Sequence, residues 1–296
     1  RKLKTICGTP LKKIIGITID RIKQKHFYQK NKELIDSRTI AFKGFSEKYL
    51  NEILILDDTD SARNLIQKYK YFIAGSDQVW NPIYINDMDK YFLTFAKKEQ
   101  RISYAASFSC PDIPEQYKLK YRDWIKGMSR ISVREETGAN IIKNLVGIEV
   151  PVLLDPTLLL SREKWISISK KPKNKPKEGY ILTYFLGRIN KKNKRYIESI
   201  AKEKKMKIIR LADIKDREAY VTSPSEFIDY INSASLFFTD SFHGVVFSVL
   251  MKTPFVVFRR INRGPSMYSR IETLLDLFNL RSREIENIRD NEELFH

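Results

Sequence analysis

The feature that most constrains the fold is a recurring unit, in which a short apolar run ends in small or polar residues and leads into a helix-forming segment. Short apolar strands that alternate with helices are typical of parallel α/β sheets, which bind ligands at the carboxyl ends of their strands. We therefore predict an α/β fold. The predicted strands are 71–74, 102–108, 131–133, 152–154, 180–186, 206–211, 236–239 and 255–258.

Segment 170–177 separates two series of these units, because it carries two prolines, five lysines and no apolar residue. Such a composition is typical of an exposed connection between domains. A chain of 296 residues is also longer than one hydrophobic core usually organises. We predict two Rossmann-like domains that face a cleft. The first is residues 1–170, with a basic helical region over about 10–50, and the second is residues 171–296.

The chain is strongly basic, with 54 Lys and Arg against 36 Asp and Glu and a net charge of +18. Residues 1–32 alone hold ten basic residues and one acid. This excess favours an anionic partner. No nucleic acid is expected, because the aromatic residues follow core periodicity instead of interleaving with the basic ones. The basic region is expected to rest on an anionic membrane surface, with a solvated helical face as the alternative.

Other compositional features exclude several classes of protein. No apolar stretch approaches the roughly 20 residues that a membrane span needs. The two cysteines, Cys7 and Cys110, lie far apart and without metal-ligand spacing, so neither a disulfide framework nor a metal site is expected. We predict a cytoplasmic protein that is peripheral at the inner face of the membrane where its basic region meets lipid.

His243 is the only plausible catalytic histidine of the three in the chain, because it lies in a predicted strand-to-helix turn. A histidine at a helix N-terminus combines a titratable ring with free backbone N–H groups, which suits an anion. Asp240, Ser241 and Gly244 flank it as candidate binding residues. The alternative is a capping turn in which Asp240 or Ser241 caps the helix and His243 only packs.

Three further strand ends carry candidate binding residues. The glycine of the GSDQVWNP segment allows a tight turn, and its polar residues supply hydrogen-bonding groups. Its tryptophan either stacks on a sugar face or anchors the loop by packing. The small residues of 103–109 either make room for a ligand or allow close packing, and an arginine after the third strand suits phosphate or carboxylate. The acid beside that arginine is a candidate base or an ordinary first-turn acid. These candidates are Gly75, Ser76, Asp77, Gln78, Trp80, Asn81, Ser107, Arg134 and Glu135.

Taken together and in order, five segments resemble the polysaccharide pyruvyl transferase family: GSDQVWNP, SYAASF, ISVREETGANIIKNL, VLLDPTLLL and TDSFHGVVFSVLMKTPFVVF. The resemblance runs from about Phe42 to Phe258. It implies a two-domain fold similar to that of GT-B glycosyltransferases, with phosphoenolpyruvate as co-substrate and no other cofactor. It also implies a sugar or lipid-linked oligosaccharide acceptor, a cyclic pyruvate ketal as product, and a place in bacterial-type surface polysaccharide biosynthesis.

The chain departs from the family pattern in two respects. Many members carry an arginine two residues before the matching histidine, where this chain has Ser241, so Arg134 is the candidate for the cation that binds the donor. Members also begin with a first strand and a glycine-containing loop, and the resemblance implies that these lie upstream of Arg1.

The implied reaction needs proton transfer at two points, at the methylene carbon of the donor and at the sugar hydroxyls. His243 has a suitable intrinsic pKa, and Asp77 or Glu135 can accept a hydroxyl proton. Two other functions stay open, because a fold does not fix a function. One is a GT-B glycosyltransferase that uses a nucleotide sugar, and the other is an inactive family member that acts as a binding subunit.

Overall fold

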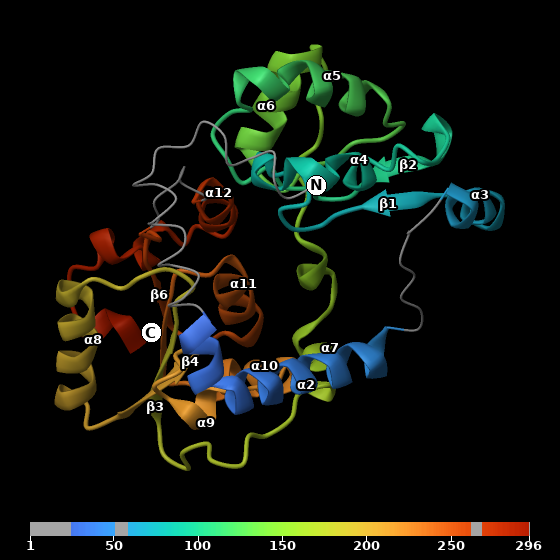
Figure 1. Ribbon diagram of the computed structural model, residues 1–296. Coiled ribbons are helices and arrows are strands. Elements are labelled where there is room, and N and C mark those ends of the chain that lie inside the picture. Colours follow the sequence, from blue (N-terminus) through green and yellow to red (C-terminus); the bar gives the residue numbers. More distant parts are fainter. Residues whose placement is uncertain (1–24, 51–58, 262–267, 296) are drawn as a thin grey trace, which may run out of the picture.

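The computed structural model describes residues 25–50, 59–261 and 268–295. The second half of the chain forms a four-stranded sheet, coloured from olive to red-brown in Figure 1. Its strands are β3 (Tyr180–Tyr184), β4 (Lys207–Leu211), β5 (Leu236–Thr239) and β6 (Phe255–Val257), in the order β4-β3-β5-β6 and all parallel. The chain runs from β3 to one neighbour and later returns to the other, so the ends of β3 and β5 form the switch point at which such sheets bind ligands.

Helices cover both faces of this sheet because successive strand residues point to opposite sides. Tyr180 and Leu182 of β3 pack with residues of α10 (Pro224–Ser233), α11 (Phe242–Met251) and α12 (Ser269–Leu277). Ile181 packs with residues of α8 (Lys191–Glu203) on the other face. The predicted start of α10 is confirmed, since Ser223 and Glu226 form a reciprocal capping box and Pro224 is the first helical residue.

The first half of the chain contains a shorter parallel sheet, β1 (Phe72–Ala74) and β2 (Arg101–Ser103). The predicted strand 102–108 is too long, because β2 ends at Ser103 and Ala105 adopts a left-handed backbone conformation (φ 49°) that interrupts a strand. Predicted strands 131–133 and 152–154 form only single parallel bridges, Ala106 to Val133 and Val133 to Val152. Their parallel direction confirms the predicted α/β class.

Four helices of the described residues flank this first part: α3 (Thr59–Lys68), α4 (Met88–Tyr91), α5 (Lys118–Lys126) and α6 (Glu136–Val146); α7 (Arg162–Ser167) follows them in the chain. The core of this part is rich in aromatic residues and includes Trp80, Phe92, Phe108 and Tyr121. α7 instead packs toward the second sheet, where Trp165 contacts Phe247 edge-on at 5.0 Å between ring centroids. α12 in turn lies against α6, so α12 connects the two parts of the molecule.

The predicted connection 170–177 follows α7 and is tied to α10. Lys175 pairs with Asp229 of α10, while Lys170, Lys171 and Lys173 are exposed. The division into Rossmann-like domains at residue 170 stays a prediction.

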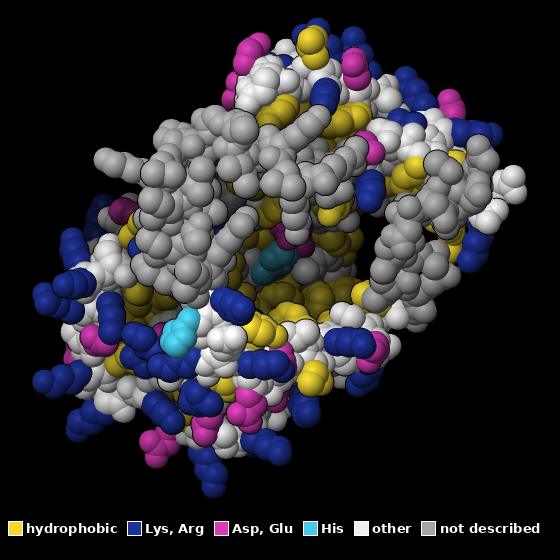
Figure 2. All heavy atoms as spheres, viewed as in Figure 1, with side chains coloured by type: hydrophobic (Ala, Val, Ile, Leu, Met, Phe, Trp, Pro, Cys, Tyr) yellow, Lys and Arg dark blue, Asp and Glu magenta, His cyan; other side chains and the backbone are white. Residues whose placement is uncertain are grey.

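The basic helical region is described from residue 25 onward, and its predicted start lies outside the described residues. Its main helix, α2 (Lys32–Tyr49), lies beside α10 and the short α9 (Arg217–Tyr220), where the Arg38 guanidinium donates to the Tyr220 carbonyl oxygen at 2.6 Å. Lys and Arg side chains are abundant over the lower part of the surface in Figure 2, the half of the view in which α2 lies in Figure 1. Within the described part of the chain, no helix is both long enough and apolar enough to cross a membrane. Contact with a lipid surface stays a prediction.

Candidate active site

The candidate site lies where strand ends from both parts of the chain meet. Asp77 follows β1, Arg134 and Asp155 follow the bridged segments at Val133 and Val152, His243 begins α11, and Arg270 begins α12. We call these five residues the guanidinium cluster. Strand ends at one edge of a parallel sheet deliver side chains to a common region, which is why motifs far apart in sequence converge here.

The loop that carries Asp77 begins with a turn at Gly75. Gly75 has a φ of +116°, and a Cβ atom there would lie 2.2 Å from the Tyr104 carbonyl oxygen, so only glycine fits. This turn places the Ser76 hydroxyl 2.9 Å from Oδ2 of Asp155 and 2.8 Å from the Ala105 carbonyl oxygen. Gly75 and Ser76 therefore shape the loop that carries Asp77.

Arg134 is the buried centre of the cluster. Its Nη1 donates to Oδ2 of Asp155 at 2.6 Å and its Nη2 to Oδ1 of Asp77 at 3.0 Å. Its guanidinium carbon lies 4.2 Å from the centre of the Phe242 ring, within the range of a cation–π contact. Asp155 is fixed in turn, because its Oδ1 accepts from the Thr157 backbone N–H at 3.1 Å and the Thr157 hydroxyl at 2.6 Å.

Arg270 is a second buried guanidinium that the sequence motifs missed. Its Nη1 donates to Oδ1 of Asp77 at 3.3 Å. The Gln78 amide, oriented with its oxygen toward Arg270, accepts from both Nη atoms at 2.8 Å. One signal was present in the sequence: Arg270 shares the buried face of α12 with Ile271, Leu274 and Leu275. An arginine at a core position of a helix needs a buried partner.

The charges of the cluster set its protonation state. Burial opposes ionisation of Asp77 and Asp155, but Arg134 and the other neighbouring hydrogen-bond donors and positive charges outweigh it, so the pKa of each carboxyl lies below its usual value. Burial, followed by the charge of Arg134, lowers the pKa of Arg270 to about 10. At neutral pH the two aspartates are therefore anionic and Arg270 is still a cation.

His243 lies at the rim of the cluster, with Nε2 3.9 Å from Oδ2 of Asp155 and 38% of its side chain exposed. Burial lowers its pKa below the ordinary histidine value even though Asp155 and Asp77 act in the opposite direction. The imidazole is therefore neutral at neutral pH and able to accept a proton. Ser241 caps α11 by accepting from the Gly244 N–H at 3.3 Å, as the capping alternative predicted, but His243 itself faces the cluster.

Gly244 allows α11 to start close to β5, because a Cβ atom there would lie 2.6 Å from the Thr239 hydroxyl oxygen. Asp240 is buried and ties the ends of β3 and β5 together: its carboxylate accepts from the Leu186 and Gly187 N–H groups at 2.7 and 2.8 Å. These two predicted binding residues support the turn that carries His243.

Two predicted site residues, Trp80 and Asn81, belong to the packing of the first part. Trp80 is fully buried and stacks on Phe92 at 4.6 Å between centroids, which matches its alternative interpretation as a packing anchor. No face of its ring is open to a sugar in this conformation. Asn81 is also buried, and its Oδ1 accepts from the Ile83 N–H at 3.0 Å to cap η1 (Pro82–Asp87).

Glu135 has a different role from its neighbour Arg134, because its carboxylate organises the loop after β2. Its Oε1 accepts from the Ser107 hydroxyl at 3.0 Å and from the Phe108 and Ser109 N–H groups at 2.9 and 3.1 Å. Burial raises the pKa of Glu135 despite these donors. Glu135 and Ser107 thus form a buried brace.

A cavity of about 340 Å³ opens beside His243 and Ser241. Its walls are mostly apolar and aromatic, and they include Phe42 and Phe45 of α2 together with Trp165 and Phe247. Figure 2 shows that this face of the molecule is hollowed between its upper and lower parts and that hydrophobic side chains line the hollow. The cavity is large enough for a small ligand next to the imidazole.

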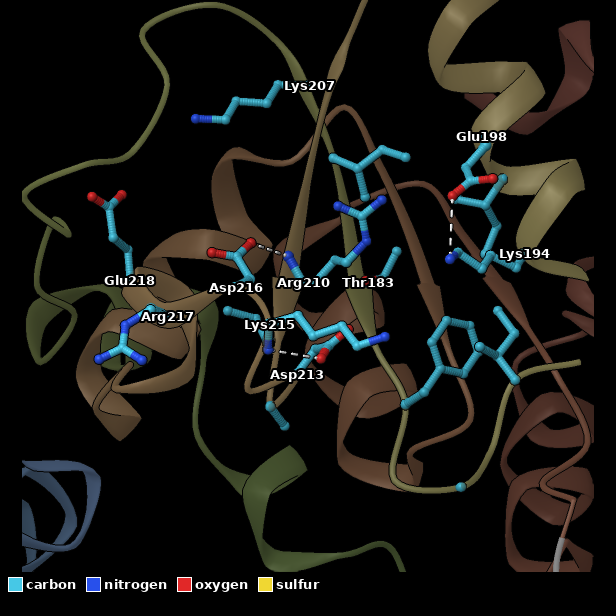
Figure 3. A pocket seen from close by; sticks show the side chains of 17 residues that line it. Thr183, Lys194, Glu198, Lys207, Arg210, Asp213, Lys215, Asp216, Arg217 and Glu218 are labelled. Carbon is cyan, nitrogen blue, oxygen red and sulfur yellow. Dashed lines mark hydrogen bonds and ion pairs between the residues drawn. The ribbon is translucent and has the colours of Figure 1, made fainter. Parts of the chain in front are cut away.

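A larger groove of about 920 Å³ runs along β4 and the first half of α8, away from the predicted residues. Its labelled basic side chains are spread around the groove, and Lys194 pairs with Glu198 at 3.7 Å (Figure 3). None of the described residues that line it is a predicted site residue. We therefore place the candidate site at the guanidinium cluster. The described residues contain no group of three His, Cys, Asp or Glu that could hold a metal ion.

The fold and the cluster define an α/β protein in which two buried arginines, two aspartates and a histidine meet at strand ends from both parts of the chain. The family model for polysaccharide pyruvyl transferases matches residues 11–262, and the chain belongs to this family. A comparison with curated proteins gives no significant match.

Proposed function

We propose that the chain transfers the pyruvyl group of phosphoenolpyruvate to a sugar and forms a cyclic ketal. The observation that carries the proposal is the convergence of two buried guanidinium groups and a neutral imidazole beside a cavity. Phosphoenolpyruvate bears a phosphate and a carboxylate, and guanidinium groups bind both through paired, charge-assisted hydrogen bonds. Membership of the pyruvyl transferase family supports the same chemistry.

The reaction balances without a cofactor or water. The methylene carbon of the donor gains a proton, and one sugar hydroxyl adds to the neighbouring carbon and gives up its proton. A second hydroxyl of the same sugar then replaces the phosphate at that carbon, and its proton leaves with the phosphate. The products are the ketal and inorganic phosphate.

The residues of the cluster have separate roles in this reaction. Arg134 and Arg270 bind the anionic donor and stabilise the charge that collects on the departing phosphate. His243 is the proton-transfer residue, because its neutral ring accepts a hydroxyl proton and a nearby dianion then favours its protonated form. Asp77 is anionic and a weak base, so it accepts a hydrogen bond more readily than a proton. The acceptor sugar occupies the cavity beside His243.

The first test is calorimetric titration of phosphoenolpyruvate into the wild type, Arg134→Gln and Arg122→Gln. Arg122 is an exposed residue of α5 and provides a control with the same change in net charge. Loss of charge-assisted hydrogen bonds should weaken binding roughly 10- to 100-fold in Arg134→Gln and leave the control unchanged. His243→Gln should keep its donor affinity and lose about 10²–10⁴ in the rate of phosphate release with a panel of diol-bearing sugars.

Absence of phosphoenolpyruvate binding by the wild type would contradict the proposal. Binding of a nucleotide sugar in the same titration would favour the glycosyltransferase alternative. Donor binding without turnover on any sugar would favour the inactive binding subunit.

A further inference from the structure

We infer that the carboxylate of Asp77 is an internal ligand that occupies the anion site, and that a small dianion displaces it on binding. The inference rests on the proposed function for the chemical class of the ligand, a phosphate-bearing dianion. It concerns which group occupies the two arginines when that ligand is absent.

The two carboxylates of the cluster differ in how firmly they are held. Asp155 is 2% exposed and bonds to Arg134 and Thr157, so it is a fixed part of the framework. Asp77 is 58% exposed and its Oδ1 is a shared acceptor for Arg134 and Arg270, at 3.0 and 3.3 Å. The two guanidinium groups are only 2% and 5% exposed. The carboxylate of Asp77 is therefore the exposed partner of two cations that are themselves shielded from solvent.

Rotation of one side chain is enough to vacate the site. The backbone of Asp77 is held in place, because its carbonyl oxygen accepts from the Val79 and Ser107 N–H groups at 2.8 and 2.9 Å. Among the described residues, the hydrogen bonds of the Asp77 carboxylate are those to the two arginines. Breaking them frees the carboxylate without moving the loop.

The arginines have more donors than the resting cluster satisfies. Each guanidinium carries five N–H groups. Nε of Arg134 and Nε of Arg270 are buried and have no hydrogen-bond partner among the described residues. A single carboxylate oxygen bridges the two groups, whereas a phosphate offers three oxygens and a second negative charge. Small rearrangements of the arginines around a phosphate would therefore satisfy donors that Asp77 leaves unpaired.

This exchange also selects among anions. A monoanion such as acetate replaces one carboxylate by another and gains little. A dianion adds a charge and further acceptors, so it gains more than the cluster loses when Asp77 leaves. We expect phosphate to compete successfully with Asp77 and acetate or chloride to compete poorly.

The test measures inorganic phosphate binding to the full chain by calorimetry, in the wild type, Asp77→Asn and Asp89→Asn. Asp89 is an exposed acid on α4, so its variant makes the same change in net charge away from the cluster. Removing a competing internal anion should tighten phosphate binding roughly tenfold in Asp77→Asn, because the binding-competent fraction rises. Asp89→Asn should bind as the wild type does, and adding Arg270→Gln to Asp77→Asn should abolish the gain.

Unchanged or weaker phosphate binding by a folded Asp77→Asn protein would overturn the inference. Should Asp77→Asn not give the native circular dichroism spectrum, Asp77→Ser makes the same comparison. The outcome is separable from the proposed function. Tighter phosphate binding without any pyruvyl transfer would retain the internal ligand and reject the transferase, whereas transfer with unchanged phosphate affinity would do the reverse.

Discussion

Asp155→Asn gives the sharpest measure of how much the cluster depends on its buried ion pair. Arg134 and Asp155 are both 2% exposed and lie 2.6 Å apart. Asparagine keeps the shape of the side chain, and its Oδ1 can still accept from Thr157, so the change isolates the charge. Removing one member of a buried pair costs about 3–5 kcal/mol, because the other charge is left uncompensated. Asp77 still neutralises part of Arg134, so we expect a loss near the lower end, about 3 kcal/mol.

The assay is urea denaturation of the wild type, Asp155→Asn and a matched surface variant, Asp276→Asn. Asp276 and Arg281 form a pair of similar length, 2.5 Å, but the side chains are 59% and 38% exposed. Water and salt screen such a pair, so its loss should change the free energy of unfolding by less than about 1 kcal/mol. If the two variants lost equal stability, the claim that burial gives the cluster its strength would be refuted.

Two further predictions concern Trp80 and His243. Trp80→Phe removes a fully buried indole and its hydrogen bond to the Tyr91 carbonyl oxygen, so the free energy of unfolding should fall by about 1–3 kcal/mol while phosphoenolpyruvate affinity stays unchanged; a selective loss of affinity would restore a ligand-binding role. The pKa of His243 is lowered in the folded state, so below its ordinary value of 6.5 the unfolded chain binds more protons than the folded chain. The wild type should therefore lose stability relative to His243→Gln as pH falls from 7.5 to 5.5, and parallel stabilities over that range would contradict a partly buried, neutral imidazole.

The second sheet could be predicted from the sequence because its signals are local. The predicted strand 236–239 begins with three apolar residues and is buried on both faces, and the structure has β5 at the same residues. The next helix, α11, starts at the cap residue Ser241. α10 starts at a capping box formed by Ser223 and Glu226, which lie within one helical turn of each other. Each signal acts within one element, so no long-range contact had to be known.

The first sheet was predicted less accurately because its strand limits depend on contacts between segments. Ser107 and Phe108 were predicted as strand residues, yet the loop they belong to turns around the buried carboxylate of Glu135. That carboxylate comes from a segment about thirty residues away. A pattern of apolar residues carries no information about such a brace.

The residues of the candidate site also differ in whether local sequence signals could predict them. His243, Arg134 and Asp77 follow strand ends and were found for that reason. Arg270 belongs to no motif and reaches the cluster because α12 packs against α6 from the other part of the chain. Asp155 was visible at a strand end but gained a role only when its partner was placed 2.6 Å away.

The net charge of the chain and the charges of the guanidinium cluster give different information about an anionic partner. The excess of +18 is a property of the whole chain, and the fields of exposed charges are screened within about 10 Å at ordinary salt. The cluster has two arginines, two aspartates and a neutral histidine, so it carries no net charge at rest. The anion binding that we propose for it depends on burial, which keeps two guanidinium groups away from water and leaves one exposed carboxylate as their shared partner. Basic composition thus favours an anion as a partner, whereas the location that we propose for the anion depends on the packing of α12 against α6, which brings Arg270 to the same aspartate as Arg134.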